Sequence, residues 1–184
     1  ALVQESSNFL AADRQISSGE AIPQAFTLAA QERGLEVAQT LVFPSMVFAG
    51  DTNQLVSVKA VDQGYPLRGK LIVGDTPFGT GVPTNDAPAP GTVWLDSRLF
   101  PAMNVKPGDV IEVGLAELKV ARVLVAEPDR GGSFFDLGPR LLMNLVDVPA
   151  TEVVQPGSRL SYRLLLAGAE DNLEGLKDQL KLTP

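Results

Sequence analysis

The residue types that carry out most protein chemistry near neutral pH are missing from this sequence. Its 184 residues include no His and no Cys, so the usual general bases, thiolate nucleophiles and transition-metal ligands are absent. Catalysis by Ser-His-Asp or Cys-His groups is therefore excluded within the chain. Carboxylate chemistry, a Ser-Lys pair or an oxygen-ligated metal ion would remain.

Ser57 and Lys59 are the only pair whose spacing suits a Ser-Lys dyad. Two residues apart in a strand, they would share one face of it. Polar residues on the solvent face of a half-buried strand have the same spacing. We favour this second interpretation, which predicts that both side chains face solvent.

Acidic residues occur in loops, but in no pattern that specifies a site. Residues 75–77 read Asp-Thr-Pro where aspartic peptidases have Asp-Thr-Gly, so an Asp that starts a turn is the better interpretation. The spacing of Asp129, Asp136 and Asp147 matches no known calcium loop, and we expect solvated turn residues. The sequence therefore predicts no catalytic residue, no cofactor site and no metal site.

A glycine-flanked loop at residues 131–139 carries two adjacent aromatic residues, Phe134 and Phe135. Alternation would turn one ring inward and leave the other exposed. Burial of both rings against the domain's own core is favoured, because large apolar groups usually find burial. Contact with a partner is the alternative, and the residues we expect in such a contact are Phe134, Phe135, Leu137 and Phe78.

Composition and charge exclude two further classes of protein. The formal charge is −7 and no run of Lys or Arg is present, so nucleic acid is not expected as a partner. A membrane-spanning helix needs roughly 20 mainly apolar residues. The apolar runs here are far shorter, so no segment is expected to cross a bilayer.

Pattern and turn residues predict most of the secondary structure. Pro23 suits the start of a helix and Gly34 its end, which predicts a helix over residues 23–33. Residues 36–49 and 54–61 predict a hairpin, with Pro44 at a bulge or edge position because proline cannot donate a ladder bond. Residues 1–11 predict the end of a helix, with Leu2 and Val3 on its apolar face.

The remaining elements are predicted from the same signals. Strands are expected at residues 13–18, 69–73, 92–95, 110–113, 118–126, 140–146 and 158–166, a short helix at 97–103, a surface loop at 76–91, and a closing helix on the stripe Leu173, Leu176 and Leu180. This order predicts an α+β fold with two lobes. Residues 1–61 and 157–184 would form an α/β sandwich (β-α-β-β…β-α), and residues 62–156 an inserted, small β-rich lobe.

Five blocks of sequence resemble successive parts of one family. They read AADRQISSGEAIP, TLVFPSMVFAGDTNQLVSVKAVDQGYPLRGKL, VWLDSRLFPAMNVKPGDVIEVG, PRLLMNLVDVPAT and VQPGSRLSYRLLLAG. Together they resemble the large extracytoplasmic domain of FtsX/MacB/LolC-type ABC transporter permeases, above all the YbbP-type branch, over nearly the whole chain. The hairpin FPSMVFAG with the following LVSVKAV and GYPLRG is the most specific part.

The resemblance implies a periplasmic domain of an inner-membrane permease. In this family the domain lies between the first two transmembrane helices and combines a porter-like α/β lobe with an inserted β lobe. A separate ATPase subunit, movement of the domain by ATP-driven helices, and a lipophilic substrate or protein partner are implied as well. For the YbbP-type branch a periplasmic esterase is the implied partner. The family has no catalytic residues in this domain, so a non-enzymatic role is expected.

Two other functions remain as alternatives. One is a freestanding hydrolase that uses carboxylates, for which a deep pocket with two cooperating acids would be required. The other is a binding domain similar to a double-psi barrel, because the Pro107-Gly108-Asp109 turn before an alternating strand is typical of small barrels. A domain held between two membrane helices would instead need both of its ends on one side.

Overall fold

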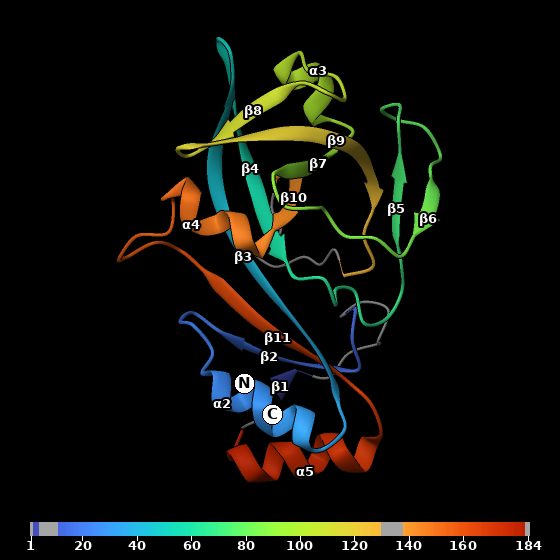
Figure 1. Cartoon of the computed structure of the whole chain (residues 1–184), viewed down its shortest axis with the longest axis vertical. Coiled ribbons are helices and arrows are strands. Elements are labelled where there is room, and N and C mark those ends of the chain that lie inside the picture. The colour runs from blue at the N-terminus through green and yellow to red at the C-terminus, as the bar shows by residue number, and fades with distance from the viewer. Residues whose placement is uncertain (1, 4–10, 130–137, 183–184) are drawn as a thin grey trace.

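The strands of the protein join a single mixed sheet. The structure, a computed structural model, describes residues 2–3, 11–129 and 138–182. Its 11-stranded sheet has the order β1-β2-β11-β3-β4-β10-β7-β9-β5-β6, and β8 pairs with both β3 and β9. Two helices, α2 (Gln24–Glu32) and α5 (Glu170–Leu180), cover one end of this sheet (Figure 1), and the fold is α+β, as predicted.

Apart from its first strand, the first half of the chain follows the sequence prediction closely. It forms β1 (Leu2–Val3), β2 (Arg14–Ser18), α2 (Gln24–Glu32), β3 (Glu36–Ala49) and β4 (Thr52–Val61). Strands β3 and β4 pair without a register shift from Ala49 and Thr52 to Thr40 and Val61. The predicted hairpin is therefore confirmed over its whole length.

Pro44 occupies an edge position inside this long strand. It pairs in register with Ser57 of β4, so there is no bulge. The amide of Ser57 donates to Pro139, away from β3, which makes this a non-hydrogen-bonded pair with the nitrogen of Pro44 facing away from β4. On that side β11 pairs only as far as Val42 and β8 begins at Val47. The missing N–H of Pro44 thus falls in a gap between two partner strands.

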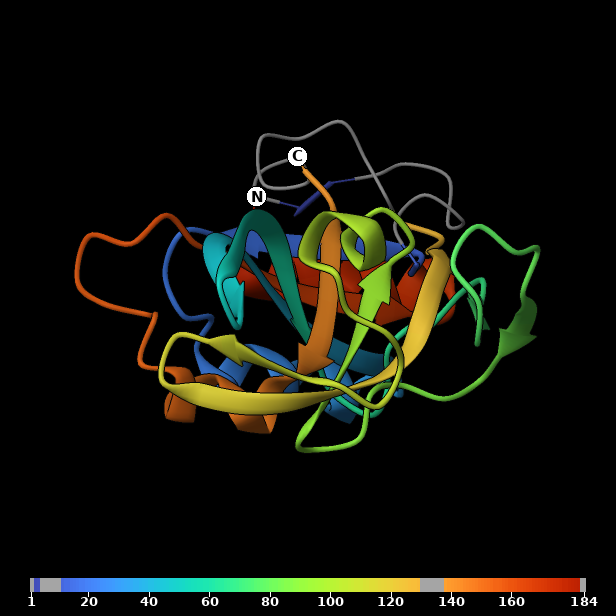
Figure 2. The same cartoon turned by 90° about the horizontal axis from the view of Figure 1, so that it is seen from above.

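The second half supplies the β-rich part and the closing helix. Its elements are β5 (Leu71–Gly74), β6 (Val82–Thr84), β7 (Thr92–Asp96), α3 (Leu99–Met103), β8 (Val110–Val113), β9 (Ala116–Ala126), β10 (Arg140–Asn144), α4 (Val148–Thr151), β11 (Ser161–Ala167) and α5 (Glu170–Leu180). Figure 2 shows β4, β10 and β7 side by side, with β9 beyond them. Most predicted strands lie within a few residues of these bounds.

Three local predictions were wrong. Leu2 and Val3 pair with β2 as a short strand instead of ending a helix; residues 4–10 lie outside the described part. The expected loop at 76–91 contains β6, whose Pro83 is tolerated because β6 is the last strand of the sheet order. Strand β10 ends at Asn144, whose side chain accepts a hydrogen bond from the amide of Val146 and starts a 3-10 turn at Leu145–Asp147.

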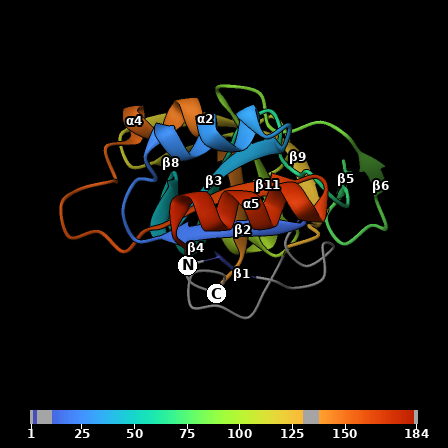
Figure 3. The same cartoon turned by 90° about the horizontal axis from the view of Figure 1, so that it is seen from below.

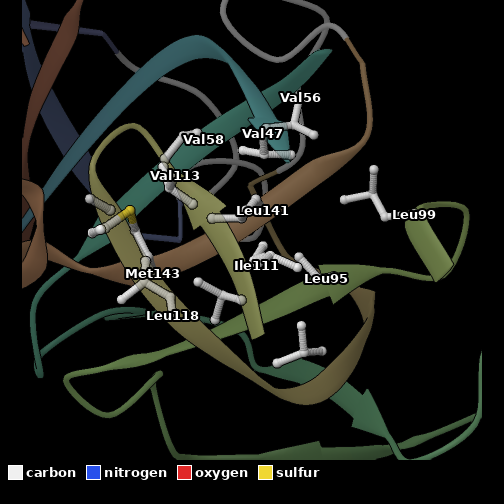
Figure 4. Packing of buried hydrophobic residues seen from close by; sticks show 14 of the residues in the cluster. Val47, Val56, Val58, Leu95, Leu99, Ile111, Val113, Leu118, Leu141 and Met143 are labelled. Atoms are coloured by element: carbon white, nitrogen blue, oxygen red, sulfur yellow. The ribbon is translucent and has the colours of Figure 1, made fainter. Parts of the chain in front are cut away.

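The apolar core has three parts. Helices α2 and α5 pack on β2 and β11 at one end of the molecule (Figure 3), where Leu164, Leu173 and Leu176 are buried together. The largest cluster lies between the β3–β4 hairpin, β7, β10 and the curved β8–β9 pair (Figure 4). A third cluster surrounds Tyr65 and Trp94 on the opposite face of the β4, β10 and β7 strands.

Strand β3 connects these regions. It pairs with β11 near the helices and with β8 at Val47 and Phe48, so the tip of the β3–β4 hairpin lies at the end of the molecule opposite α2 and α5 (Figure 1). The division of the chain into two lobes stays a prediction. None of the described helices is long and apolar enough to cross a membrane.

Candidate functional site

Ser57 and Lys59 lie on the buried face of β4, not on a solvent face. Their relative exposures are 1% and 0%. The prediction that they face solvent was wrong, because residues that follow β9 and begin β10 cover this face of the strand. Alternation places both side chains on one face, but it cannot say what covers that face.

The Lys59 ammonium contacts three oxygen acceptors. Its Nζ atom lies 2.9 Å from the Tyr65 hydroxyl and 3.2 Å from Oε2 of Glu127, and it donates a short hydrogen bond to Oδ2 of Asp129. A lysine ammonium has three N–H donors. All three are therefore used, as a buried cation requires.

The turn that follows β4 places the Tyr65 side chain next to Lys59. Asp62 shapes this turn, because its carboxylate accepts the amides of Gln39 at 2.8 Å and Gly64 at 3.0 Å. The Tyr65 hydroxyl then donates to Oδ1 of Asp129 at 2.5 Å.

Both Asp62 and Tyr65 have raised pKa values. Burial is the largest cause in each case; for Asp62 the backbone hydrogen bonds from Gln39, Gly64 and Tyr65 act in the opposite direction. For Tyr65 the pKa lies well above its ordinary value, because the charges of Asp129 and Glu127 add to the effect of burial. Tyr65 is therefore a neutral hydrogen-bond donor over the physiological pH range.

Arg140 is the second buried cation. Its Nε donates to Oε1 of Glu127 at 2.7 Å, and its Nη1 donates to the Ser57 hydroxyl at 2.6 Å. The hydroxyl of Ser57 is thus bound to Arg140, whereas Lys59 is bound to acids and a phenol. The two residues share a face but form no Ser-Lys dyad.

We call this group the ion cluster; its members are Ser57, Lys59, Tyr65, Glu127, Asp129 and Arg140. Among these described members, two cations meet two carboxylates, so their formal charges balance. A buried ion pair is a poor source of net stability but costs much when one partner is removed. Asp129 and Arg140 both bind side chains of β4, so the cluster joins the residues after β9 and the first residue of β10 to that strand.

A pocket of about 260 Å³ lies beside the ion cluster, smaller than most ligand sites. It is lined by Asp96, Arg98, Leu124, Val125, Ala126, Glu127 and Arg140. The Arg98 side chain donates two hydrogen bonds to Asp96, of 3.1 and 2.9 Å. Arg140 donates to Glu127. The two acids are therefore paired with cations and not with each other, which is not the arrangement that a carboxylate hydrolase needs.

The structure describes one of the four predicted contact residues. Phe78 is 69% exposed, and its amide donates to the Ser97 hydroxyl at 3.0 Å, beside the pocket residues Asp96 and Arg98. Phe134, Phe135 and Leu137 lie outside the described residues.

The structure describes two of the three candidate calcium-binding aspartates, Asp129 and Asp147. Asp129 belongs to the ion cluster, and Asp147 instead accepts the amide of Gly91 at 2.7 Å. Asp136 lies outside the described residues. Among residues 2–3, 11–129 and 138–182, no group of three or more acids is placed to hold a metal ion.

Sequence reasoning missed Tyr65, Glu127 and Arg140 as members of one site. One signal was available: Lys59 stands in the middle of an apolar strand, between Val58 and Ala60. A lysine there requires an acidic partner, and acids precede residues 130–137 while Arg140 follows them. The pairing itself is set by tertiary structure.

A sequence comparison identifies one curated relative. The chain is 44% identical over 179 residues to an uncharacterized ABC transporter permease, YbbP of Escherichia coli K12. The match covers 97% of this chain but only 21% of YbbP, so the chain spans about a fifth of the relative's length. No protein-family model matches the chain.

Three solved structures have a similar fold. The extracellular domain of the ABC-type transporter YknZ from Gram-positive bacteria matches with a TM-score of 0.57 and 12% identity over 91% of this chain and 86% of that domain. The periplasmic region of MacB from Actinobacillus actinomycetemcomitans gives a TM-score of 0.56 and 13% identity over 96% and 86% of the two chains. A domain of a putative permease from Porphyromonas gingivalis gives a TM-score of 0.52 and 13% identity. This match covers 90% of this chain and 71% of that domain.

These matches bear on the alternatives. No match bears the name of a hydrolase, so the freestanding hydrolase receives no support. By sequence the chain is similar to a segment of the ABC transporter permease YbbP, and its fold is similar to the folds of the periplasmic region of MacB and the extracellular domain of YknZ.

Proposed function

We propose that the chain is a non-catalytic domain that transmits ATP-driven movement of transmembrane helices to a lipophilic substrate or a periplasmic partner protein. The observation that carries this proposal is the match to YbbP along 97% of the chain. A separate ATPase subunit would drive the movement, and a periplasmic esterase is the protein partner we favour. The ion cluster supports a non-catalytic role, because its serine and lysine are bound to partners other than each other.

The positions of the first and last described elements support attachment to a membrane. Strand β1 and helix α5 lie at the same end of the molecule (Figure 1). If the chain continues into a transmembrane helix on each side, both connections leave from this end. The helical end then faces the membrane, and the tip of the β3–β4 hairpin points away from it.

We further propose the two-lobe division into residues 1–61 with 157–184, and 62–156. The separate core around α2 and α5 supports the first lobe. The core beneath β8 and β9 also includes residues of β3 and β4, so it links the two lobes. Because β3 has partners in both cores, a push at the helical end would be carried along a continuous strand. The domain would move as one body relative to the membrane.

The contact surface is proposed to include Phe78, together with Phe134, Phe135 and Leu137. Phe78 supports this assignment because a large apolar side chain is exposed beside the pocket of Asp96 and Arg98. Such a surface suits either an acyl chain or an apolar part of a partner protein.

Fluorescence distances test the movement. The full-length permease and its ATPase would be placed in nanodiscs with fluorescent lipids, and a dye attached at a Leu115→Cys substitution. The 184 residues contain no native cysteine, so only cysteines elsewhere in the full-length permease would first have to be replaced. We expect the dye–lipid distance to differ between ATP-bound and nucleotide-free states, while a dye pair at Leu28 and Leu115 reports a constant distance. An unchanged dye–lipid distance in every nucleotide state would contradict the proposal.

Photo-crosslinking tests the contact surface separately. A photoreactive phenylalanine at position 78 should give an adduct in cells, whereas the same residue at Val146, an exposed apolar position in the turn after β10, should not. Mass spectrometry of the adduct distinguishes lipid from protein. If position 78 yields nothing beyond the Val146 control, Phe78 is not part of a contact surface.

A further inference from the structure

The tip of the β3–β4 hairpin carries a second exposed apolar surface, which we call the hairpin patch. It consists of Met46, Phe48 and Leu55, which are 41%, 42% and 54% exposed. Met46 and Leu55 are directly opposite each other across the hairpin, and Phe48 lies two residues along β3 on the same face. The three side chains therefore form one continuous surface.

The other face of the same strands is filled, so the patch is not a sign of poor packing. Val47 and Val56 alternate with the patch residues and are fully or almost fully buried. They point into the main core together with Val113 of β8 (Figure 4). The hairpin thus buries one apolar face and leaves the other apolar face open, where a solvent-facing strand would normally carry polar residues.

Two carboxylates border the hairpin patch. Phe48 pairs with Glu112 of β8, and Glu112 pairs in turn with Glu117 of β9. Phe48, Glu112 and Glu117 therefore form a row on the outer face of the sheet. Like charges directly opposite each other in adjacent strands destabilise the pairing.

Nothing in the described part of the chain offsets this repulsion. Neither Glu112 nor Glu117 has an ion pair or hydrogen bond from its side chain to a described residue. Lys119 is the nearest basic residue along the strand pair, but it stands opposite Val110 and forms no ion pair with either acid. The two negative charges are thus available to a molecule outside the chain.

We propose that the hairpin patch docks a segment of another protein that presents apolar side chains flanked by Lys or Arg. The apolar side chains would cover Met46, Phe48 and Leu55, and the basic ones would neutralise Glu112 and Glu117. With three apolar side chains as its centre, the contact is small and suits a transient encounter.

The charges argue against two other occupants. An anionic membrane surface would be repelled by Glu112 and Glu117. A second copy of this chain, docked through a twofold axis on the patch, would bring the two acidic pairs towards each other. A basic, apolar protein segment is the occupant that both the apolar side chains and the acids favour.

This inference goes beyond the proposed function, since the patch is distinct from the surface at Phe78 and does not depend on a transported substrate. It also does not require the chain to be attached to a membrane. If it is attached through the end that carries β1 and α5, the patch lies at the far end (Figure 1), where a partner in the extracytoplasmic space could reach it.

A peptide titration tests the proposal on the 184-residue chain. The probe is a short peptide in which Leu and Phe alternate with Lys, and amide chemical shifts of the isotope-labelled chain report its position. We expect shifts at the β3–β4 tip and along β8, and an affinity that weakens with added salt. Phe48→Ser should weaken binding about tenfold, and the Glu112→Gln, Glu117→Gln variant should remove most of the salt dependence.

Matched controls distinguish binding at the hairpin patch from non-specific binding. Leu28→Ser alters an apolar residue of similar exposure, 51%, on α2 and should leave peptide binding unchanged. A peptide with Glu in place of Lys should not bind. Shifts that avoid the hairpin, equal binding of the acidic peptide, or binding of the chain to phosphatidylglycerol vesicles through this hairpin would each overturn the proposal. Concentration-dependent dimerisation that Phe48→Ser abolishes would overturn it in favour of a self-contact.

Discussion

The ammonium of Lys59 lies 3.2 Å from the carboxylate of Glu127, and neither side chain has more than 3% of its surface exposed. The two residues come from β4 and from the chain directly after β9. Their contact lies on the same face of the sheet as Tyr65, Asp129 and Arg140, and it helps to cover that face. The ion cluster therefore joins the hairpin to the second half of the chain by charge.

Removing the cation from this cluster should be costly. In Lys59→Met the carboxylates of Glu127 and Asp129 stay buried and lose the counter-charge that both of them contact, so we expect a loss of about 3–5 kcal/mol in the free energy of unfolding. Urea denaturation at neutral pH measures it. Arg98→Met is the matched control, because it breaks the more exposed pair with Asp96 and should cost less than about 1 kcal/mol. Similar losses in the two variants would mean that the cluster is not a buried network.

The phenol of Tyr65 should make stability fall at alkaline pH. Its folded pKa is raised above the ordinary value of about 10, so the folded state keeps a proton that the unfolded chain releases. The stabilisation is complete below that value and is lost as the pH rises towards the folded pKa.

Tyr65→Phe tests this linkage. At neutral pH the variant loses the hydrogen bond to Asp129 and should be about 1–3 kcal/mol less stable. Above about pH 10 the difference in unfolding free energy between wild type and variant should shrink. Only the wild type has this phenol, whose proton is released in the unfolded chain and kept in the folded one, so only the wild type loses stability for this reason. Tyr162→Phe, outside the cluster, serves as the control. A gap that stays constant or widens with pH contradicts the assignment.

The hairpin was predictable because its signals are local. Gly50 to Asn53 favours a turn, and alternating apolar residues on both sides fix the register of β3 and β4. The face of β4 that carries Ser57 and Lys59 was assigned wrongly because its cover, Glu127, Asp129 and Arg140, lies about seventy or more residues along the chain. Local periodicity contains no information about a partner that distant.

The short strand β6 was missed for a related reason. Val82, Pro83 and Thr84 stand in a proline-rich stretch, and proline argues against a strand. They pair with β5 on one side only, so the missing N–H of Pro83 is tolerated at an edge. Whether a strand is central or at an edge is a property of the assembled sheet.

Gly114 should tolerate no side chain at the β8–β9 turn. Its φ of +56° is in the left-handed region, and a Cβ there would overlap the backbone oxygen of Thr151 and Cγ1 of Val153. Gly50, at φ +57° in the β3–β4 turn, has open space around it. Gly50→Ala should therefore cost only the backbone strain of about 1–2 kcal/mol, and Gly114→Ala about 1–3 kcal/mol more. Equal losses in thermal or urea denaturation would show that Thr151 does not pack against this turn.

The two proposed lobes should unfold together, because β3 pairs with β11 in one and with β8 in the other. Two probes report them separately: the single Trp, Trp94, is buried in the core around Tyr65, and the helical circular dichroism comes largely from α2 and α5. We expect their denaturation curves to coincide. Leu176→Ala, under α5, and Leu141→Ala, in β10, should each shift both curves equally, by about 2–5 kcal/mol. If either variant moves one curve and leaves the other in place, the lobes are independent units, and β3 cannot carry movement from the helical end to the hairpin tip.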